Sequence, residues 1–412
     1  FLISILVIFS TTKISNVANM PKYQNIFWSN SFNFFMKLPD PIKSSFMIFS
    51  GKRNFSNLFN DYNVKFLPET QYINLDFIKK DINFKKANRH TFYIDVFSDE
   101  LIFVTKDGNF FRSKIDNLKD DSKKLKFEKI KVNNFYNELE KEKQILDILV
   151  IKDEIFITTP SKYEECSKLE IKVSKIKDNL NFKTFKLFNE CIEIKAGAGR
   201  IKEFYFNNKS GLLVTTLDGD NDAPGKKAQK DSSIFGKIIF VDLETQQHEV
   251  FSKGHRNAQG LYVLDDKIFS TEHGPRGGDE LNRIFYNKNY GWPIASYGNS
   301  YNKKDLVYKK SHKDNSFEEP LHVFLPSIGI SELIALPNQF NENWKNNLII
   351  SSLNGRSLYR VKFDSSNFDN ILYTEKIYIG ERIRDIKYLD ELNIIILALE
   401  RTGSIGIIKN ID

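Results

Sequence analysis

The feature that most constrains the fold of this chain is a short phrase that recurs six times after about residue 90. Each copy consists of an apolar run, a turn and a second apolar run. The copies are SDELIFVTKDGNFFRSKI (98–115), KDEIFITTPSKYEECSKLEIKVSKI (152–176), NKSGLLVTTLDGD to FGKIIFVDL (208–243), DDKIFSTEHGPRGGDELNRIFY (265–286), WKNNLIISSLNGRSLYRVKF (344–363) and LDELNIIILALERTGSIGIIKN (389–410). Paired short strands that repeat every roughly 40 to 60 residues are typical of propeller blades. The sequence therefore predicts an all-β, six-bladed β-propeller. A β-sandwich and two stacked barrels are the alternatives, because strand-rich repeats alone do not prove ring closure.

Composition and charge agree with a strand-rich globular protein. The chain has 412 residues, with 36 Phe and 17 Tyr, and this composition favours strands and a large core. The net charge is +7, but the lysines are scattered singly and no Arg-rich helix is present. A solvated lysine-rich surface explains this charge, and we expect no nucleic-acid partner.

The N-terminal part of the chain has a different character. Residues 1–18 begin with FLISILVIFS, which resembles the apolar part of a secretory signal peptide ending after Ala18. An uncleaved membrane anchor or a buried segment is the alternative. We expect export to the periplasm or secretion, with no stable membrane span after signal removal. Residues 19–88 are predicted to form a short irregular N-terminal extension, and residues 89–412 the propeller.

The chain has two cysteines, Cys166 and Cys191, in neighbouring strand-like segments. In an oxidising compartment they could pair, but two cysteines do not make a disulfide framework. A buried pair of free thiols is an equal alternative.

The fourth repeat contains an unusual stretch, TEHGPRGGDELN, at residues 271–282. Glycines let a backbone approach a ligand or ion closely. The stretch is not a phosphate-binding P-loop, because it lacks the Gly-Lys-Ser/Thr ending and the strand-to-helix setting. Carbonyls freed by such a loop, beside the carboxylates of Asp279 and Glu280, are hard oxygen ligands of the kind that suit calcium. A calcium-binding loop and a plain structural turn both fit this pattern.

Four motifs in order carry a family resemblance: GHRNAQGL (254–261), EHGPRGGDELN (272–282), NYGWP (289–293) and GERIRDI (380–386). Together they resemble the soluble aldose sugar dehydrogenases, the glucose/sorbosone dehydrogenase propellers that use pyrroloquinoline quinone (PQQ) and calcium. The match covers about residues 90–410. It implies oxidation of a sugar C1 hydroxyl by hydride transfer to the quinone, with a small sugar or sugar-like substrate and an electron acceptor of unknown identity.

The resemblance also implies roles for individual residues. Arg256 and Asn257 match the pair that holds the quinone oxygens. Gly274 and Pro275 match the residues whose carbonyls bind the calcium that polarises the quinone. For the remaining matches, Glu280 and the main chain of Tyr290 correspond to ligands of a second, structural calcium, Tyr301 to a quinone contact, and Arg382 and Arg384 to the pair near the cofactor carboxylates.

The chain departs from the family pattern where the catalytic base belongs. The family has a histidine in an H-x-G-G-R-L segment, whereas the matching segment here is AGAGRI, with Ala196 at the histidine position. A methyl group cannot accept a proton. Two further departures are Glu142 at a glutamine position and Asn354 at a lysine position. Three interpretations follow: a dehydrogenase that uses another base, such as His255 or His273, a calcium-stabilised propeller that binds a quinone, sugar or protein partner without catalysis, and a purely structural propeller.

Overall fold

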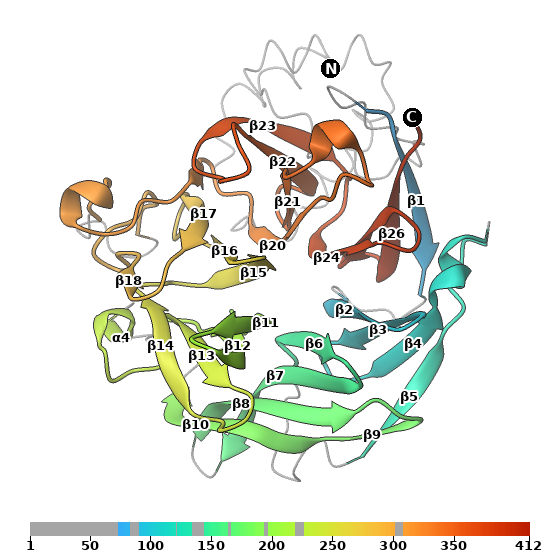
Figure 1. Ribbon diagram of the computed structural model, residues 1–412, viewed down its shortest axis with the longest axis horizontal. Coiled ribbons are helices and arrows are strands. Elements are labelled where there is room, and N and C mark those ends of the chain that lie inside the picture. Colours follow the sequence, from blue (N-terminus) through green and yellow to red (C-terminus); the bar gives the residue numbers. More distant parts are fainter. Residues whose placement is uncertain are drawn as a thin grey trace, which may run out of the picture. The chain divides into compact units, whose positions relative to one another are not determined.

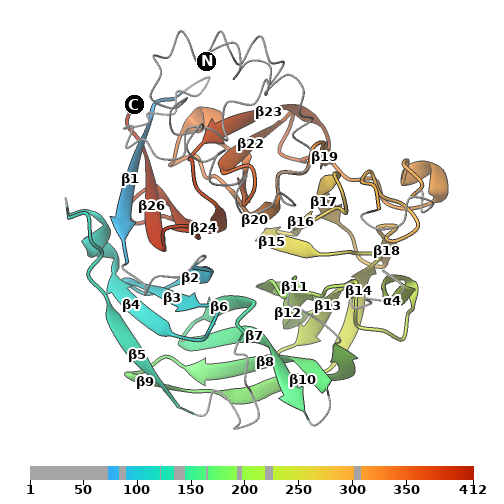
Figure 2. The ribbon, with the colours of Figure 1, turned by 180° about the vertical axis from the view of Figure 1, so that it is seen from behind.

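The computed structural model describes residues 73–82, 90–120, 122–133, 144–163, 166–192, 197–218, 226–300 and 308–412. These residues belong to one compact unit, Lys65–Asp412. Six sheets of four or five strands stand around a common centre, as Figures 1 and 2 show from opposite sides. The predicted six-bladed propeller is confirmed, and the sandwich and barrel alternatives are excluded.

The first three sheets each begin with their innermost strand. The first sheet contains β2 (Phe92–Phe97), β3 (Glu100–Thr105), β4 (Phe110–Lys114), β5 (Glu128–Asn133) and β9 (Asn179–Asn181). The second contains β6 (Asp147–Ile151), β7 (Glu154–Tyr163), β8 (Cys166–Lys175) and β10 (Lys183–Ile192). The third contains β11 (Ile201–Phe206), β12 (Lys209–Thr215), β13 (Lys237–Asp242), β14 (His248–Lys253) and β18 (Lys288–Asn289).

The other three sheets follow the same plan. The fourth contains β15 (Ala258–Leu264), β16 (Lys267–Glu272), β17 (Asp279–Ile284) and β19 (His322–Phe324). The fifth contains β20 (Ile330–Ala335), β21 (Leu348–Ser352), β22 (Ser357–Phe363) and β23 (Ile371–Tyr378). The sixth contains β24 (Ile383–Leu389), β25 (Ile394–Leu399), β26 (Ser404–Asn410) and β1 (Leu75–Asp81). The described helical segments are short: α4 (Lys226–Gln229), η3 (Ile115–Leu118), η4 (Lys313–Asn315) and η5 (Glu342–Trp344).

The repeated phrases of the sequence are the second and third strands of the six sheets. These strands carry continuous apolar runs because both of their faces are buried between neighbouring sheets. In β25, for example, Ile395, Leu397 and Leu399 pack toward the fifth sheet, whereas Ile394 and Ile396 pack toward the first. In the part of the chain that the structure describes, each pair of neighbouring sheets shares a hydrophobic cluster of this kind.

The ring is closed by a strand from the N-terminal side of the propeller. Strand β1 pairs with β26 in antiparallel register from Leu75 opposite Asn410 to Asp81 opposite Ser404. The sequence predicts that these residues belong to an N-terminal extension, residues 19–88. In the structure the propeller already includes β1, which begins at Leu75. The reason is that β1 lacks the strand-turn-strand signal of the repeats and finds its partner at the far end of the chain.

Cys166 and Cys191 form a disulfide that joins β8 to β10, the outer pair of the second sheet. The alternative of two free thiols is therefore excluded. None of the described helices has the length and hydropathy needed to span a bilayer. The predicted signal peptide, residues 1–18, lies outside the described residues.

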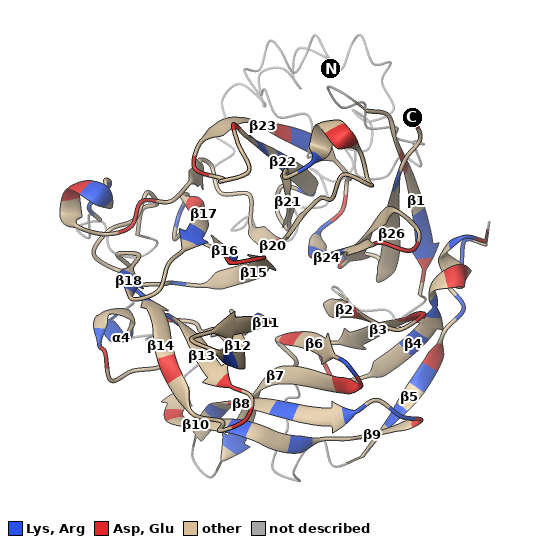
Figure 3. Cartoon of the chain, in the orientation of Figure 1, with Lys and Arg blue, Asp and Glu red and all other residues tan. Residues whose placement is uncertain are grey.

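The centre of the ring is filled by the side chain of Arg200, which precedes β11 and is 1% exposed. Its Nη1 atom lies 3.0 Å from Asp147 Oδ1, 3.4 Å from Glu332 Oε2 and 3.5 Å from Asp385 Oδ1. These carboxylates come from β6, β20 and β24, the inner strands of three other sheets. Figure 3 shows acidic and basic positions on β6 and β24 near the centre of the ring.

Arg200 also reaches the two remaining sheets. Its Nε donates to the carbonyl of Gln259, on β15 of the fourth sheet, at 2.6 Å. Its Nη2 makes a further contact with the sixth sheet, because it donates to the carbonyl of Arg384 on β24 at 2.9 Å. The guanidinium carbon lies 5.0 Å from the ring centroid of Tyr93 on β2. One side chain therefore connects its own sheet to the other five.

Candidate functional site

Arg256 lies in the segment between β14 and β15, where it is partly buried. Its Nη1 donates to the carbonyls of His273 and Gly274, both at 3.0 Å, and its guanidinium lies 5.2 Å from the ring of Trp292. Its backbone N–H donates to the carboxylate of Glu272. The Nε of Arg256 is buried and has no hydrogen-bond partner among the described residues. This donor is therefore available to an acceptor supplied by a ligand.

Asn257 directly precedes β15 and contacts Gly197, in the 196–201 segment. Its Oδ1 accepts from Gln259 Nε2 at 2.8 Å, and its Nδ2 lies 3.5 Å from His273 Nδ1. A Cβ added to Gly197 would lie 2.8 Å from Asn257 Oδ1, so Gly197 packs tightly against this amide. Ala196 itself lies outside the described residues, as do Tyr301 and Glu142.

Arg382 and Arg384 lie at the start of β24 and share one carboxylate. Arg382 Nε donates to Glu400 Oε2 at 2.7 Å, and Arg384 Nη2 donates to Glu400 Oε1 at 2.9 Å. The Thr91 hydroxyl donates to the same carboxylate. Burial alone would raise the pKa of Glu400, but the two arginines and the Thr91 hydroxyl outweigh it and lower that pKa to about 2. Glu400 is thus a fixed anion that orients both guanidinium groups.

Of the predicted calcium ligands, Gly274 and Pro275 lie between β16 and β17, Glu280 lies on β17 and Tyr290 directly follows β18. Gly274, Glu280 and Tyr290 line one small pocket together with Arg256, Glu272 and His312. Pro275 packs against Gly298 in the following loop. The predicted cofactor and calcium residues of this part of the chain therefore occupy adjacent positions.

The glycines of the 271–282 stretch are required by a backbone that folds back on itself. A Cβ added at Gly274 would lie 2.2 Å from the carbonyl oxygen of Gly278 and 2.3 Å from that of Gly277. Gly277 and Gly278 have φ values of +88° and +70°. Side chains rarely adopt this left-handed region. The loop therefore needs glycine for close packing and for positive φ.

The carboxyl group of Glu280 is buried in this pocket. Burial raises its pKa well above the usual range, and the nearby carboxylate of Glu272 raises it further. His312 Nε2 lies 3.7 Å from Glu280 Oε1, while His312 Nδ1 and Asn282 Oδ1 are buried without hydrogen-bond partners among the described residues. No group of three or more His, Cys, Asp or Glu side chains positioned to hold a metal occurs in the described part of the chain. A cation here would therefore need backbone carbonyls as additional ligands.

His255 and His273 are the two predicted substitute bases. His255 is fully buried, with Nε2 2.8 Å from the Ser252 hydroxyl and Nδ1 3.1 Å from Glu272 Oε2, so both of its nitrogens are occupied. His273 Nε2 lies 2.6 Å from the carbonyl of Ile330. Burial lowers the pKa of His273, which favours its neutral form. His255 has a structural role, whereas His273 lies beside Asn257.

The sequence model of the family described as Glucose / Sorbosone dehydrogenase matches residues 155–407, more than half of the chain. The chain belongs to this family. The matched region includes β7 through most of β26, and thus all the described site residues.

Curated relatives of this family member match over part of their length. An uncharacterized protein of Synechocystis sp. is 31% identical over 47% of this chain and 52% of its own length. The aldose sugar dehydrogenase YliI of Escherichia coli is 26% identical over 58% of this chain and 66% of its own. Quinoprotein glucose dehydrogenase B of Acinetobacter calcoaceticus is 30% identical over 42% and 32%. The chain thus spans between about a third and two thirds of these relatives.

Solved structures agree on the propeller fold. A glucose dehydrogenase crystal structure has a TM-score of 0.68 and 21% identity, covering 81% of this chain and 99% of its own. The apo-form of the soluble aldose sugar dehydrogenase from Escherichia coli has a TM-score of 0.64 and 18% identity, with the same coverage. The PQQ-bound aldose sugar dehydrogenase from Streptomyces coelicolor has a TM-score of 0.58 and 16% identity, covering 81% and 98%.

Two polar residues of the site, Gln259 and Glu400, were not predicted from the sequence. Gln259 joins Asn257 to Arg384, and Glu400 joins Arg384 to Arg382. Gln259 lies inside the GHRNAQGL motif, whose unusual Gln in a strand was a signal that could have found it. Glu400 lies in the last repeat, where a lone acid after the apolar run IIILAL gave a weaker signal. Asn354 is exposed, and its backbone N–H donates to the Ile328 carbonyl; its match to a lysine position of the family stays a prediction.

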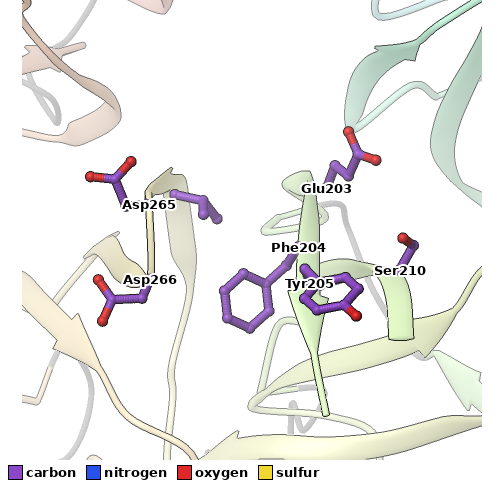
Figure 4. Close-up of a pocket in the computed structure, with 7 residues that line it drawn as sticks. Glu203, Phe204, Tyr205, Ser210, Asp265 and Asp266 are labelled. Atoms are coloured by element: carbon purple, nitrogen blue, oxygen red, sulfur yellow. The ribbon is translucent and has the colours of Figure 1, made fainter. Parts of the chain in front are cut away.

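A second pocket lies away from this site. Figure 4 shows Tyr205 on β11 on one side and Asp265 and Asp266 in the β15–β16 turn on the other. Asp265 follows the last residue of β15, whereas Asn257 precedes the first. The second pocket is therefore at the opposite end of the inner strand from the predicted cofactor site.

Proposed function

We propose that the chain is an aldose sugar dehydrogenase that uses PQQ and calcium, with catalysis impaired by Ala196. The observation that carries the proposal is the pocket shared by Arg256, Gly274 and Glu280, which are separate in sequence and have distinct expected roles. The hydrogen bonds through Gln259 connect this pocket to Arg384. The substrate class is a small sugar or sugar-like molecule with an oxidisable C1 hydroxyl.

The residues fit an anionic, carboxylate-rich cofactor. Arg256 has a buried Nε with no partner among the described residues, and guanidinium groups bind carboxylates with a planar fork of donors. Glu400 accepts hydrogen bonds from Arg382 and Arg384, and the remaining N–H groups of the two guanidinium groups would bind the ligand. When bound, PQQ would supply a quinone that accepts a hydride from the sugar.

The residues near Glu280 fit a calcium ion. A buried carboxylate whose pKa is raised by burial and by a second carboxylate is stabilised by a bound cation. Calcium prefers carboxylate and carbonyl oxygens. Glu280 and the main chain of Tyr290 would provide them for a structural ion, and the carbonyls of Gly274 and Pro275 for a second ion that would supply positive charge next to the cofactor.

A second candidate function is binding of PQQ or a sugar without turnover. It is favoured by the lack of a base at position 196 and by the engagement of both nitrogens of His255. Oxidation of the C1 hydroxyl requires an acceptor for the hydroxyl proton. The two candidates share the ligand site and differ in this step alone.

We also propose that the protein works in the periplasm or outside the cell. The disulfide between Cys166 and Cys191 supports this location, because disulfides persist in oxidising compartments and are rare in reducing ones.

The proposed function is tested by titrating the calcium-loaded chain with PQQ and following the absorption spectrum of the quinone. Aldoses and an artificial electron acceptor are then added. We expect calcium-dependent binding and slow reduction of the acceptor. No PQQ binding, with or without calcium, would refute the dehydrogenase and the binding of PQQ, and would leave a propeller that binds a sugar or has a purely structural role.

The substitution Ala196→His separates the two candidates. It restores a base at the family position, and a well-placed general base contributes about 10²- to 10⁴-fold to rate. We expect PQQ affinity to stay the same and sugar-dependent reduction to rise by about a hundredfold, the lower end of that range. An Ala196→Ser chain serves as the control for a change of size without a base. If Ala196→His does not increase turnover, loss of the base is not what limits the reaction.

A further inference from the structure

We propose that Gln259 is a positioning residue whose side-chain amide dictates the orientation of the Asn257 amide toward the ligand. This inference rests on the proposed function, because it assigns Asn257 to the cofactor site. Gln259 lies on β15, two residues after Asn257, and is 8% exposed. Its backbone carbonyl accepts a hydrogen bond from Arg200 Nε at 2.6 Å, and this bond fixes the backbone of Gln259.

The guanidinium group of Arg384 can only donate hydrogen bonds. Arg384 Nη1 lies 3.0 Å from the Gln259 side chain, and the atom that faces it must therefore be the acceptor, Oε1. The other end of the Gln259 amide, Nε2, lies 2.8 Å from the Asn257 side chain. Because Nε2 only donates, Asn257 must present Oδ1 to it.

The orientation of Asn257 is checked independently at the opposite end. With Oδ1 directed to Gln259, its Nδ2 faces His273 Nδ1 at 3.5 Å. The other ring nitrogen of His273 lies 2.6 Å from the Ile330 carbonyl, which can only accept. The ring proton is therefore on Nε2, and Nδ1 is an acceptor for Asn257. Both ends of the chain of hydrogen bonds require the same direction.

We define the polarity relay as Arg384, Gln259, Asn257, His273 and Ile330, in the order in which hydrogen bonds are donated. Its first member is itself fixed, because Arg384 also donates to the buried carboxylate of Glu400. The relay makes Asn257 a donor on the side away from Gln259. A donor is what a quinone or carboxylate oxygen needs, whereas the flipped amide would present a repelling oxygen.

The relay is tested with Gln259→Met, which keeps the length of the side chain and removes both hydrogen bonds without adding charge. Asn257→Ala and the double variant complete a double-mutant cycle. We expect Gln259→Met to weaken PQQ binding by about tenfold, the loss of roughly one hydrogen bond. In the Asn257→Ala background the same substitution should change the affinity by much less, since its target is gone.

A matched control is Asn347→Leu. Asn347 is fully buried, accepts from Arg360 Nη1 at 2.9 Å and donates to the Lys345 carbonyl at 3.0 Å. It is therefore another amide between a guanidinium and an acceptor, outside the polarity relay. We expect it to reduce thermal stability as Gln259→Met does and to leave PQQ affinity unchanged. Equal PQQ affinity for Gln259→Met and the unmodified chain, or multiplicative effects of Gln259→Met and Asn257→Ala, would overturn the proposal.

A second measurement needs no PQQ. Nitrogen NMR of the histidine rings in the unmodified, ¹⁵N-histidine-labelled chain reports the tautomer of His273, assigned by the signal missing from a His273→Gln chain. The relay requires the Nε2–H tautomer, and an Nδ1–H tautomer would contradict it. A chain that shows the expected tautomer but binds no PQQ would refute the proposed function and support the relay.

Discussion

Glu400 holds Arg382 and Arg384 with its two carboxylate oxygens while being 1% exposed. This arrangement is stable only if the carboxylate stays ionised, because protonation would leave two partly buried guanidinium groups competing for one acceptor oxygen. Glu400 directly follows β25, and its ion pairs connect the end of that strand to the start of β24. The site therefore depends on a residue that makes no predicted contact with the ligand.

The pH dependence of stability should reveal this role. The pKa of Glu400 is about 2 in the folded state, against an ordinary value of 4.5. A depressed folded-state pKa stabilises the protein above the unfolded value, and this contribution is lost as pH falls from about 4.5 toward 2. We expect Glu400→Gln to be less stable than the unmodified chain at pH 6, with a difference that shrinks below pH 4.5.

Urea unfolding at a series of pH values measures this difference. Glu244, an exposed glutamate in the turn after β13, provides the control. Glu244→Gln should change the free energy of unfolding by less than about 0.5 kcal/mol. A Glu400→Gln deficit that is the same at pH 3 and pH 6 would show that the carboxylate charge does not stabilise the fold.

At the scale of elements, the second sheet is the one reinforced by a covalent bond. Strands β8 and β10 are neighbours, and the segment after β10 leads to Gly197, which packs against Asn257. The disulfide closes a loop of 25 residues between Cys166 and Cys191. It ties β10, which is the outer edge of this sheet and the strand that precedes the 196–201 segment, to β8.

Reduction of the disulfide should lower stability in a predictable way. The loop-closure entropy of a cross-link of this length corresponds to about 3 kcal/mol. We expect a reducing agent to lower the melting temperature of the unmodified chain and to have no effect on a Cys166→Ser/Cys191→Ser chain. The measurement is a thermal melt of both chains with and without the reductant. Equal sensitivity of the two chains would show that the reductant acts elsewhere.

At the scale of the whole molecule, Arg200 connects the six sheets at the axis. It compensates Asp147, Glu332 and Asp385, whose side chains are all 2% exposed or less. Breaking a buried ion pair leaves an uncompensated charge, which costs about 3–5 kcal/mol. Because the carboxylates belong to three sheets, the effect should spread over the ring and not remain in one blade.

We expect Arg200→Met to lower the free energy of unfolding by about 3–5 kcal/mol. Arg112→Met is the control, because Arg112 pairs with two exposed carboxylates, Glu128 at 3.5 Å and Asp178 at 3.6 Å. Surface pairs of this kind contribute about 0–1 kcal/mol. Urea unfolding followed by tryptophan fluorescence and by circular dichroism compares the two. A loss for Arg200→Met no larger than that for Arg112→Met would exclude the axial role.

The hairpins could be predicted from the sequence because strand, turn and strand are adjacent, and their patterning is local. The glycine loop and the order of the motifs were equally visible, and the structure places Gly274, Glu280 and Arg256 around one pocket. The predicted roles of these residues, and of Asn257, Arg382 and Arg384, stay predictions. Ala196 and Tyr301 lie outside the described residues.

The sequence by itself determined the all-β class, the number of blades and the residues that resemble a quinone and calcium site. Only the tertiary structure decided ring closure by β1, the cysteine pairing and the contacts of Gln259 and Glu400. The physical reason is distance along the chain: Gln259 and Arg384 are 125 residues apart, and β1 meets β26 across more than 300 residues. Local patterning specifies each hairpin, whereas burial around a common axis selects which side chains meet.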